Sequence, residues 1–361
     1  MLDVYADRFR RVKHLMEQNG CDALIVTATP NVFYFTGKWI DPHERLLAVL
    51  IRQGKDPVVF APSLHTGDFD PNQMECVFLN DGEDNIGLLA QYLDNTGTVS
   101  IDNTWQSANL LALMAKKPNL KFVASDHVLV PLRTIKDAQE IEFIRTSGQL
   151  ADRVMAGIIA QVRPGITELE IVEELKSLWK KEGIHELSFS PGIGRGPNGA
   201  NPHHSPGHDA IRHGDMLIID MGGVYNHYCS DMTRTIAIGE ASDKQREVYN
   251  LVRLANETAQ KKVKPGVRFM DIDLAARQVI EDGGYGPLFT HRTGHGLGIE
   301  IHEAPYVHKA NEQLVEPGMV FSIEPGIYIP GEFGVRIEDI VIATEDGCES
   351  FNLAPKDLII V

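Results

Sequence analysis

The sequence predicts a two-domain protein of the α+β class: a smaller N-terminal α/β domain, then a larger domain that contains an internal duplication. Its 361 residues exceed what a single ordinary core holds. In the first third, short apolar runs alternate with amphipathic stretches, and two stretches of the remainder resemble each other. With 43% hydrophobic and 23% charged residues, the composition is that of a globular protein. We place the domains at residues 1–128 and 129–361.

The first third has the alternating pattern of a mixed sheet covered by helices. Apolar runs predict strands, and apolar residues at helical spacing predict helices. The predicted strands are 23–27, 46–51, 58–61 and 99–102, and the predicted helices are 5–19, 86–94 and 107–116. Residues 126–131 are the predicted join between the domains, and 136–159 is predicted to be one long helix.

In the C-terminal two-thirds of the chain, the same motifs occur twice in the same order. Residues 163–166 (RPGI) recur as 264–267 (KPGV), and residues 214–220 (GDMLIID) recur as 318–324 (GMVFSIE). An acid ends the second motif of each copy, and another acid follows later in each. Several matches in one order indicate an internal duplication in which each half supplies two acids. These acids are Asp220, Asp231, Glu324 and Glu338.

Strand and turn signals predict a β-hairpin in each copy. The turns are predicted at 224–227 and at 330–332. Residues that are directly opposed in a hairpin share a face, with Cβ atoms about 4.5–5.5 Å apart. The neighbours of the acids are apolar, so the acids are expected to face a buried core. The expected opposed pairs are Asp220 with Asp231 and Glu324 with Glu338.

Four carboxylates that face one core require a counter-charge, because like charges at that distance raise one another's pKa. A cation resolves this conflict, and four acids exceed the needs of one ion, so two divalent ions with bridging carboxylates are predicted. His295 adds a nitrogen ligand, and Gly294 and Gly296 let the backbone approach closely. The predicted metal ligands are Asp220, Asp231, His295, Glu324 and Glu338.

Oxygen-rich ligands and two ions predict hydrolysis by an activated water. Water held between two ions becomes a hydroxide nucleophile that attacks a carbonyl. The reaction then needs hydrogen-bond donors for the oxyanion and a proton source for the leaving amine. Arg336, two residues before Glu338, shares its face of the strand, where supporting a ligand and binding a substrate carboxylate are both open to it. The histidine candidates are His203, His291 and His302.

Other classes of protein find less support in the sequence. The formal charge of −16 argues against nucleic-acid binding, and no apolar run approaches the roughly 20 residues of a membrane span. Residues 1–17 lack the apolar segment of a secretory signal, so a cytoplasmic location is expected. Residues 192–196 (GIGRG) do not open a helix as a phosphate loop does, and we interpret them as a flexible segment that leads to His203. We interpret Cys229 as a packed cysteine, because no base is specified for it.

Five motifs stand in a characteristic order: 219–222 (IDMG), 230–235 (SDMTRT), 293–298 (TGHGLG) with 301–303 (IHE), 322–326 (SIEPG) and 335–339 (VRIED). This set resembles the metallopeptidases of the pita-bread fold, the family of methionine aminopeptidase, aminopeptidase P and prolidase (Xaa-Pro dipeptidase). The resemblance implies a pita-bread catalytic domain with a pseudo-two-fold duplication, preceded by the smaller α/β domain of the proline-specific members. Creatinase shares the fold but lacks the ligands, and all five ligand positions are occupied here.

The resemblance also implies roles for the predicted ligands. Asp220 would bind one metal ion, and Asp231 and Glu338 would bridge the two ions. His295 and Glu324 would hold the other ion, with Glu324 also acting as the proton shuttle. Carboxylate-rich sites suit manganese, and cobalt or zinc could substitute.

The remaining site residues also stand at family positions. His203 stands where the proline-specific members place an active-site histidine, and its neighbour His204 is an open alternative. The other positions that match are His291, His302 and Arg336.

Chain length and the single N-terminal domain are most similar to those of bacterial prolidases. The resemblance implies a small peptide substrate with proline at its second position, and a homodimer in which residues 41–45 reach the active site across the dimer. Aminopeptidase P activity on longer peptides and hydrolysis of another small amide are the alternatives. A non-catalytic binding protein of the same fold is the alternative from another class.

Overall fold

The computed structural model describes residues 3–361, and the chain divides into two compact units, Met1–Arg133 and Thr134–Val361. The smaller unit is α/β and the larger is α+β, which confirms the predicted fold class. The domain division that we predict after residue 128 falls inside helix α5 (Asp126–Thr134).

The N-terminal unit is built on a six-stranded mixed sheet of order β4-β3-β2-β1-β5-β6. Strands β1–β2 and β2–β3 pair antiparallel, while β3–β4, β1–β5 and β5–β6 pair parallel. The sequence reasoning missed the strands at the two edges, β4 and β6, which have more exposed residues than the central ones. The strands are β1 (Ala23–Val26), β2 (Ala48–Arg52), β3 (Val58–Pro62), β4 (Glu75–Leu79), β5 (Gly97–Ile101) and β6 (Leu120–Ala124).

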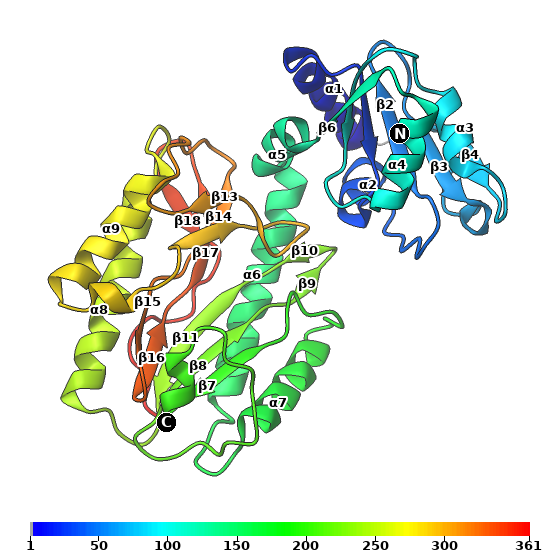
Figure 1. The fold of residues 1–361 in the computed structure, drawn as a ribbon. Helices are drawn as coiled ribbons and strands as arrows, with labels where there is room; N and C mark the ends of the chain where they lie inside the picture. The colour runs from blue at the N-terminus through cyan, green and yellow to red at the C-terminus, as the bar shows by residue number, and fades with distance from the viewer. Residues whose placement is uncertain (1–2) are drawn as a thin grey trace. The chain divides into compact units, whose positions relative to one another are not determined.

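Helices accompany this sheet, as Figure 1 shows. They are α1 (Asp3–Gln18), α2 (Thr29–Thr36), α3 (Asn85–Gln91), α4 (Ser107–Lys116) and α5, with the short 3-10 helix η1 (Ser63–His65). In the segment 41–45, Arg45 forms a two-pronged ion pair with Asp81, with 2.9 Å from Nε to Oδ1 and 2.9 Å from Nη2 to Oδ2.

The C-terminal unit places one helix pair on each side of a layer of strands (Figure 1). The first pair is α6 (Ala138–Ile159) and α7 (Glu168–Lys181), and the second is α8 (Asp243–Lys262) and α9 (Phe269–Asp282). One hydrophobic cluster lies around the first pair with β7, β8 and β11, and another lies around the second pair with β14 to β17. The strands of the first half are β7 (Gly192–Arg195), β8 (Met216–Met221), β9 (Val224–Tyr225), β10 (Tyr228–Cys229) and β11 (Met232–Ala237). Those of the second are β12 (Gly294–Gly296), β13 (Glu303–Val307), β14 (Val320–Ile323), β15 (Gly326–Ile329), β16 (Phe333–Arg336), β17 (Asp339–Ala343) and β18 (Cys348–Ser350).

The backbone confirms the internal duplication in detail. The repeated Pro-Gly turns both hold their glycine in the left-handed region, at φ 93° for Gly165 and 82° for Gly266. Both glycine N–H groups donate to a segment that follows the helix, to Ile211 O and Val315 O respectively. Only glycine adopts this backbone conformation without strain, which explains why the motif repeats in both halves.

Of two predictions for the first half, the long helix at 136–159 is confirmed and the flexible segment at 192–196 is not. The long helix is confirmed as α6, which begins with a capping box between Asp137 and Glu140. The interpretation of residues 192–196 as a flexible segment is wrong, because Gly192–Arg195 form strand β7. This strand pairs antiparallel with β8 and places Gly192 opposite Asp220.

Within residues 3–361, the structure contains no helix that is both long enough and apolar enough to cross a lipid bilayer.

Candidate metal centre

The second hairpin places its two acids as predicted. Strands β14 and β17 pair Ile323 with Asp339, and β15 and β16 pair Gly326 with Arg336. The same register continues through the residues between these ladders, so Glu324 lies opposite Glu338. The turn is a three-residue loop at 330–332, in which Gly331 has φ 76°. The register therefore confirms the predicted pair.

The first hairpin corrects the predicted register by two residues. Strand β8 pairs Asp220 with Thr233, not with Asp231. The turn is tighter than the predicted four-residue turn, because Tyr225 and Tyr228 are already paired and only residues 226 and 227 form the turn. An offset of two residues keeps both acids on one face of the sheet. Asp220 and Asp231 are thus diagonal neighbours that still face the same cavity.

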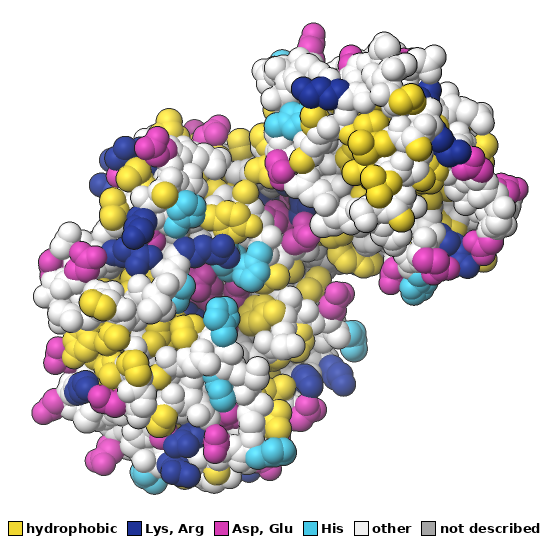
Figure 2. Space-filling model, viewed as in Figure 1, with side chains coloured by type: hydrophobic (Ala, Val, Ile, Leu, Met, Phe, Trp, Pro, Cys, Tyr) yellow, Lys and Arg dark blue, Asp and Glu magenta, His cyan; other side chains and the backbone are white. Residues whose placement is uncertain are grey.

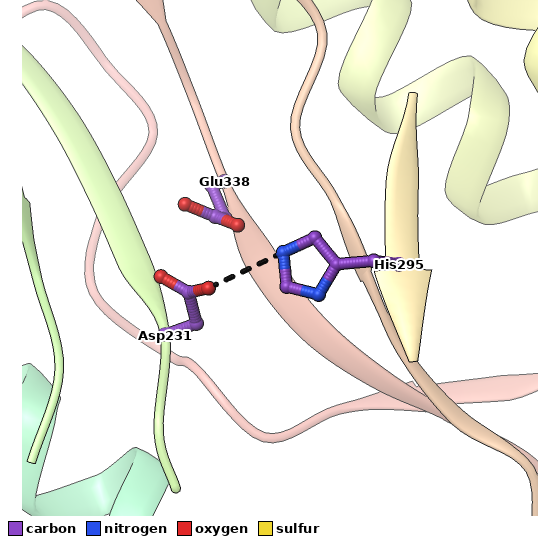
Figure 3. A group of neighbouring side chains, drawn as sticks. All are labelled: Asp231, His295 and Glu338. Atoms are coloured by element: carbon purple, nitrogen blue, oxygen red, sulfur yellow. Dashed lines mark ion pairs between the residues drawn. The ribbon is translucent and has the colours of Figure 1, made fainter. Parts of the chain in front are cut away.

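Three of the predicted ligands converge on one point. Ligand atoms of Asp231, His295 and Glu338 lie within 4.8 Å of one another, and all three side chains are buried (Figure 3). The Nε2 atom of His295 lies 3.5 Å from Oδ2 of Asp231 and 3.5 Å from Oε1 of Glu324. Distances of this size leave room for an ion between the ligand atoms.

The backbone around His295 explains its flanking glycines. A Cβ atom on Gly294 would lie 1.9 Å from Ser322 O, and one on Gly296 would lie 2.4 Å from Ala304 O. Both positions therefore require glycine, as the sequence predicts. His295 Nδ1 lies 3.1 Å from Gly296 O, and because a carbonyl only accepts, Nδ1 carries the proton. The lone pair of Nε2 is then available to a metal ion.

Burial and mutual repulsion dominate the electrostatics of three of the acids. Burial, reinforced by the charges of Asp220 and Glu324, raises the pKa of Asp231 well above its usual value. Burial and Asp231 do the same to the pKa of Glu338. Burial also raises the pKa of Asp220, against the opposing effect of Arg336. The buried Oδ1 atom of Asp220 has no hydrogen-bond partner within residues 3–361. An unpartnered oxygen among mutually repelling acids fits a site for divalent cations.

Glu324 differs from the other three acids. Burial favours its neutral form, but the nearby His295 and His291 outweigh burial, so its pKa is lowered. This carboxylate is therefore ionised at neutral pH and can accept a proton.

Arg336 contacts Asp220, a predicted ligand, directly, with 2.7 Å between Nη2 and Oδ2. Its Nη1 donates to the hydroxyl of Tyr328 at 3.0 Å, and its Nε donates to Thr233 Oγ1 at 3.1 Å. Thr233 Oγ1 in turn donates to Glu338 Oε2 at 2.8 Å. Of the two functions that were open to Arg336, this geometry favours the support of ligands.

His291 also has both ring nitrogens engaged. Nδ1 donates to Arg292 O at 2.7 Å, and Nε2 lies 2.8 Å from the hydroxyl of Tyr328. Burial lowers the pKa of His291, so Nε2 of the neutral ring accepts the hydroxyl proton. Sequence reasoning missed Tyr328, although a tyrosine follows an aliphatic residue at the same place in both copies, at Val224-Tyr225 and at Ile327-Tyr328. Burial raises the pKa of Tyr328 to about 12, so it remains a hydrogen-bond donor at neutral pH.

All the predicted site residues line one cavity of about 680 Å³. Figure 2 shows acidic and histidine side chains together in a hollow on this face of the C-terminal unit. Within residues 3–361, the ring nitrogens of His203 and His302 have no protein hydrogen-bond partner, and the ring of His302 packs edge-on to His295 with centroids 4.3 Å apart. Burial, together with His295, lowers the pKa of His302. The lining includes Asp220, Asp231, His295, Glu324, Glu338, His203, His204, His291, His302 and Arg336.

A fully buried carboxylate separates the roles of His203 and His204. His204 Nε2 lies 2.8 Å from Oε2 of Glu168, at the start of α7. Glu168 also accepts hydrogen bonds from Gly207 N at 2.9 Å and from Arg195 N at 3.0 Å. His204 is thus an anchor of its loop, whereas His203 is exposed to the cavity. The geometry favours His203 as the active-site histidine.

A buried ion network fixes the backbone at Glu338, which lies between strands β16 and β17. Arg234 donates to the backbone oxygen of Glu338 at 2.7 Å and to Asp339 Oδ1 at 2.7 Å. Lys356 lies 2.6 Å from the other oxygen of Asp339. Burial favours the neutral form of Asp339, but these two cations outweigh it and lower its pKa.

Cys229 does not serve as a nucleophile. Its side chain is buried, and its sulfur lies 3.7 Å from Ile299 O. Burial raises the pKa of the thiol to about 12, so the thiolate is scarce at neutral pH. The interpretation as a packed cysteine is confirmed.

The duplicated fold and its carboxylate–imidazole cage are those of a metal-dependent hydrolase. Residues 142–345 match the model of metallopeptidase family M24, and residues 8–135 match that of the creatinase/prolidase N-terminal domain. The chain therefore belongs to metallopeptidase family M24. This membership confirms the resemblance that the five motifs indicate.

Relatives and solved structures match over nearly the whole chain. An uncharacterized peptidase of Staphylococcus aureus (strain USA300) is 38% identical over 330 residues, which are 91% of this chain and 93% of the relative. A prolidase from Thermococcus sibiricus superposes with a TM-score of 0.93 at 34% identity, covering 99% of each chain. An Xaa-Pro dipeptidase from Bacillus anthracis superposes with a TM-score of 0.91 at 31% identity, covering 99% of this chain and all of the other.

Proposed function

We propose that this metallopeptidase hydrolyses the Xaa-Pro bond of dipeptides with the help of two divalent metal ions. The observation that carries the proposal is the convergence of four carboxylates and His295 on one cavity, two of them with strongly raised pKa values. The names of its structural neighbours, prolidase and Xaa-Pro dipeptidase, support the choice of proline-containing dipeptides.

The proposed ligands divide between two positions. Asp220 and Asp231 would hold one ion, His295 and Glu324 the other, and Asp231 and Glu338 would bridge them. Oxygen-dominated ligands favour manganese, with cobalt or zinc as substitutes. When bound, two such ions supply Lewis-acid chemistry: they lower the pKa of water toward neutrality and polarise a peptide carbonyl.

The side chains around the cage would perform the proton transfers. Glu324 is ionised, and its carboxylate is suited to accept a proton from the attacking water and to deliver it to the leaving proline nitrogen. The rings of His203 and His302 face the cavity with uncommitted nitrogens and would donate hydrogen bonds to the substrate. Arg336 and Tyr328 would hold Asp220 and His291 in place through the hydrogen bonds described above.

The homodimer and the cytoplasmic location remain predictions. The role of the segment 41–45 across such a dimer is also a prediction.

Hydrolysis of Ala-Pro and Ala-Pro-Gly by metal-stripped protein reloaded with manganese tests the proposal. Cleavage of Ala-Pro that is lost in Asp231→Asn is the expected result. Preferential cleavage of Ala-Pro-Gly would move the assignment to aminopeptidase P. Cleavage of neither peptide by protein that binds manganese would refute proline specificity and favour another small amide substrate. Absence of metal binding would favour the non-catalytic alternative.

A further inference from the structure

Two arginines line the cavity, and they differ in what they contact. All three kinds of nitrogen in the Arg336 guanidinium donate to protein groups: Nη2 to Asp220, Nη1 to Tyr328 and Nε to Thr233. The Arg292 guanidinium has no hydrogen bond and no ion pair to any residue within 3–361. Arg292 is therefore the cation of the cavity whose donors are available to a ligand.

A neighbouring ring holds the Arg292 side chain in position. The guanidinium carbon of Arg292 lies 4.4 Å from the centroid of the Tyr306 ring, on strand β13. Stacking on an aromatic face orients a guanidinium while leaving its in-plane N–H donors free. At the same time, Arg292 O accepts the Nδ1 proton of His291 at 2.7 Å, which ties the backbone of Arg292 to the active site.

The charge of Arg292 acts on the catalytic side of the cavity. Arg292 lines the same cavity as His302 and Glu324. A free Xaa-Pro dipeptide carries a carboxylate directly on the proline that follows the scissile bond, whereas a longer peptide has a neutral amide at that place. A cation with available donors in this cavity distinguishes these two kinds of substrate.

We propose that Arg292, oriented by Tyr306, binds the C-terminal carboxylate of the substrate and so selects free dipeptides over longer peptides. This inference rests on the proposed function and deepens it by assigning the residue that determines substrate length. Arg292 is a binding residue in this role, and the cage of metal ligands does not depend on it.

Kinetics of the manganese-loaded enzyme with Ala-Pro and with its amide, Ala-Pro-NH2, test this inference. We expect Arg292→Gln to lower kcat/KM for Ala-Pro by about 10- to 100-fold, mainly through KM, because a charge-assisted hydrogen bond is lost. The amide, which lacks the charge, should change by less than about twofold. Arg268→Gln is the matched control, since Arg268 is an exposed arginine of the same unit that pairs with Asp271. Arg268→Gln should leave kcat/KM unchanged for both Ala-Pro and Ala-Pro-NH2.

Substitutions of the ring separate orientation from charge. Tyr306→Phe retains the aromatic face and should behave as the wild type. Tyr306→Leu removes the aromatic face. It should lower kcat/KM for Ala-Pro, as Arg292→Gln does, but by a smaller factor. An equal loss for Ala-Pro and for the amide in Arg292→Gln would overturn the inference. A loss confined to an anionic first residue, as in Asp-Pro, would also overturn it.

Calorimetric binding of proline and prolinamide gives a readout that does not depend on cleavage. Wild-type protein should bind proline more tightly than prolinamide, and Arg292→Gln should abolish the difference. If the wild type cleaves neither Ala-Pro nor the amide, the proposed function fails, while the proline measurement still decides the carboxylate site. Equal binding of proline by wild type and Arg292→Gln would refute the role of Arg292.

Discussion

Replacement of Glu168 by glutamine is expected to disturb the loop of His203 without touching the metal cage. Glu168 is fully buried, and its two oxygens accept hydrogen bonds from four donors. The amide of glutamine retains one oxygen, but its NH2 group then faces the N–H of Gly207, which also donates. The donors are Arg195 N (3.0 Å), Asn198 Nδ2 (2.9 Å), Gly207 N (2.9 Å) and His204 Nε2 (2.8 Å).

The magnitude follows from these contacts. A hydrogen bond to a charged group contributes roughly 1.5–3 kcal/mol, and a buried unsatisfied donor costs roughly 1–3 kcal/mol. We expect Glu168→Gln to lower the free energy of unfolding by roughly 2–3 kcal/mol, which for a unit of this size is a fall in Tm of roughly 4–12 °C. Because His203 loses its fixed loop, kcat/KM should fall by about tenfold or more. Manganese binding should be unchanged.

Calorimetry, manganese titration and Ala-Pro kinetics on one preparation test this prediction. Glu170→Gln is the matched control, since Glu170 lies on the same helix, is exposed, and within residues 3–361 accepts side-chain hydrogen bonds only from Thr167. It should change Tm less than Glu168→Gln and leave kcat/KM unaltered. Wild-type Tm and kcat/KM in Glu168→Gln would refute the reasoning, and so would a loss of manganese binding.

Three further predictions concern the cage and its surroundings. Asp231 and Glu338 have raised pKa values in the metal-free fold, so their protonated forms stabilise that fold at low pH. This contribution to stability is lost as pH rises through the raised pKa values. Bound metal, in contrast, keeps both groups ionised. The Tm difference between manganese-loaded and metal-free protein should therefore widen from about pH 5 to about pH 8, and a constant difference would contradict this. Tyr328→Phe removes the hydroxyl on which His291 and Arg336 meet, so kcat should fall by about tenfold with unchanged manganese content; unaltered kcat would show that the hydroxyl is dispensable. Cys229, with a thiol pKa of about 12, should resist alkylation of the native protein at pH 8 as followed by mass spectrometry, and rapid labelling would show that the thiol is accessible.

The two hairpins show how far sequence reasoning reaches. In the second hairpin, Gly331 marks the turn, and the predicted register of Glu324 and Glu338 is confirmed. In the first, Asn226 and His227 adopt φ values of 48° and 67°, a two-residue turn of the type that asparagine tolerates but that histidine does not signal. The turn centre was therefore misplaced, although the alternation of a strand still put both acids on the correct face.

Other features depend on contacts that no local pattern reveals. An acid in the first turn of a helix, such as Glu168, is expected to be exposed. Glu168 is nevertheless buried, because the loop of His204 folds over it. Arg292 stands beside a recognised motif, and its contact with Tyr306 appears only once β12 and β13 are paired. The five-residue ligand set was accessible from sequence because the duplicated motifs and apolar flanks mark each member, whereas the residues that support it come from several distant segments.

Manganese stoichiometry is the most direct test of the proposed two-metal cage. Equilibrium dialysis of metal-stripped protein, followed by elemental analysis, should find two manganese ions per chain in the wild type. Asp231→Asn and Glu338→Gln remove proposed bridging carboxylates and should each bind fewer ions at the same free concentration. Two ions in every variant, or none in the wild type at millimolar manganese, would contradict the assignment of these residues as metal ligands.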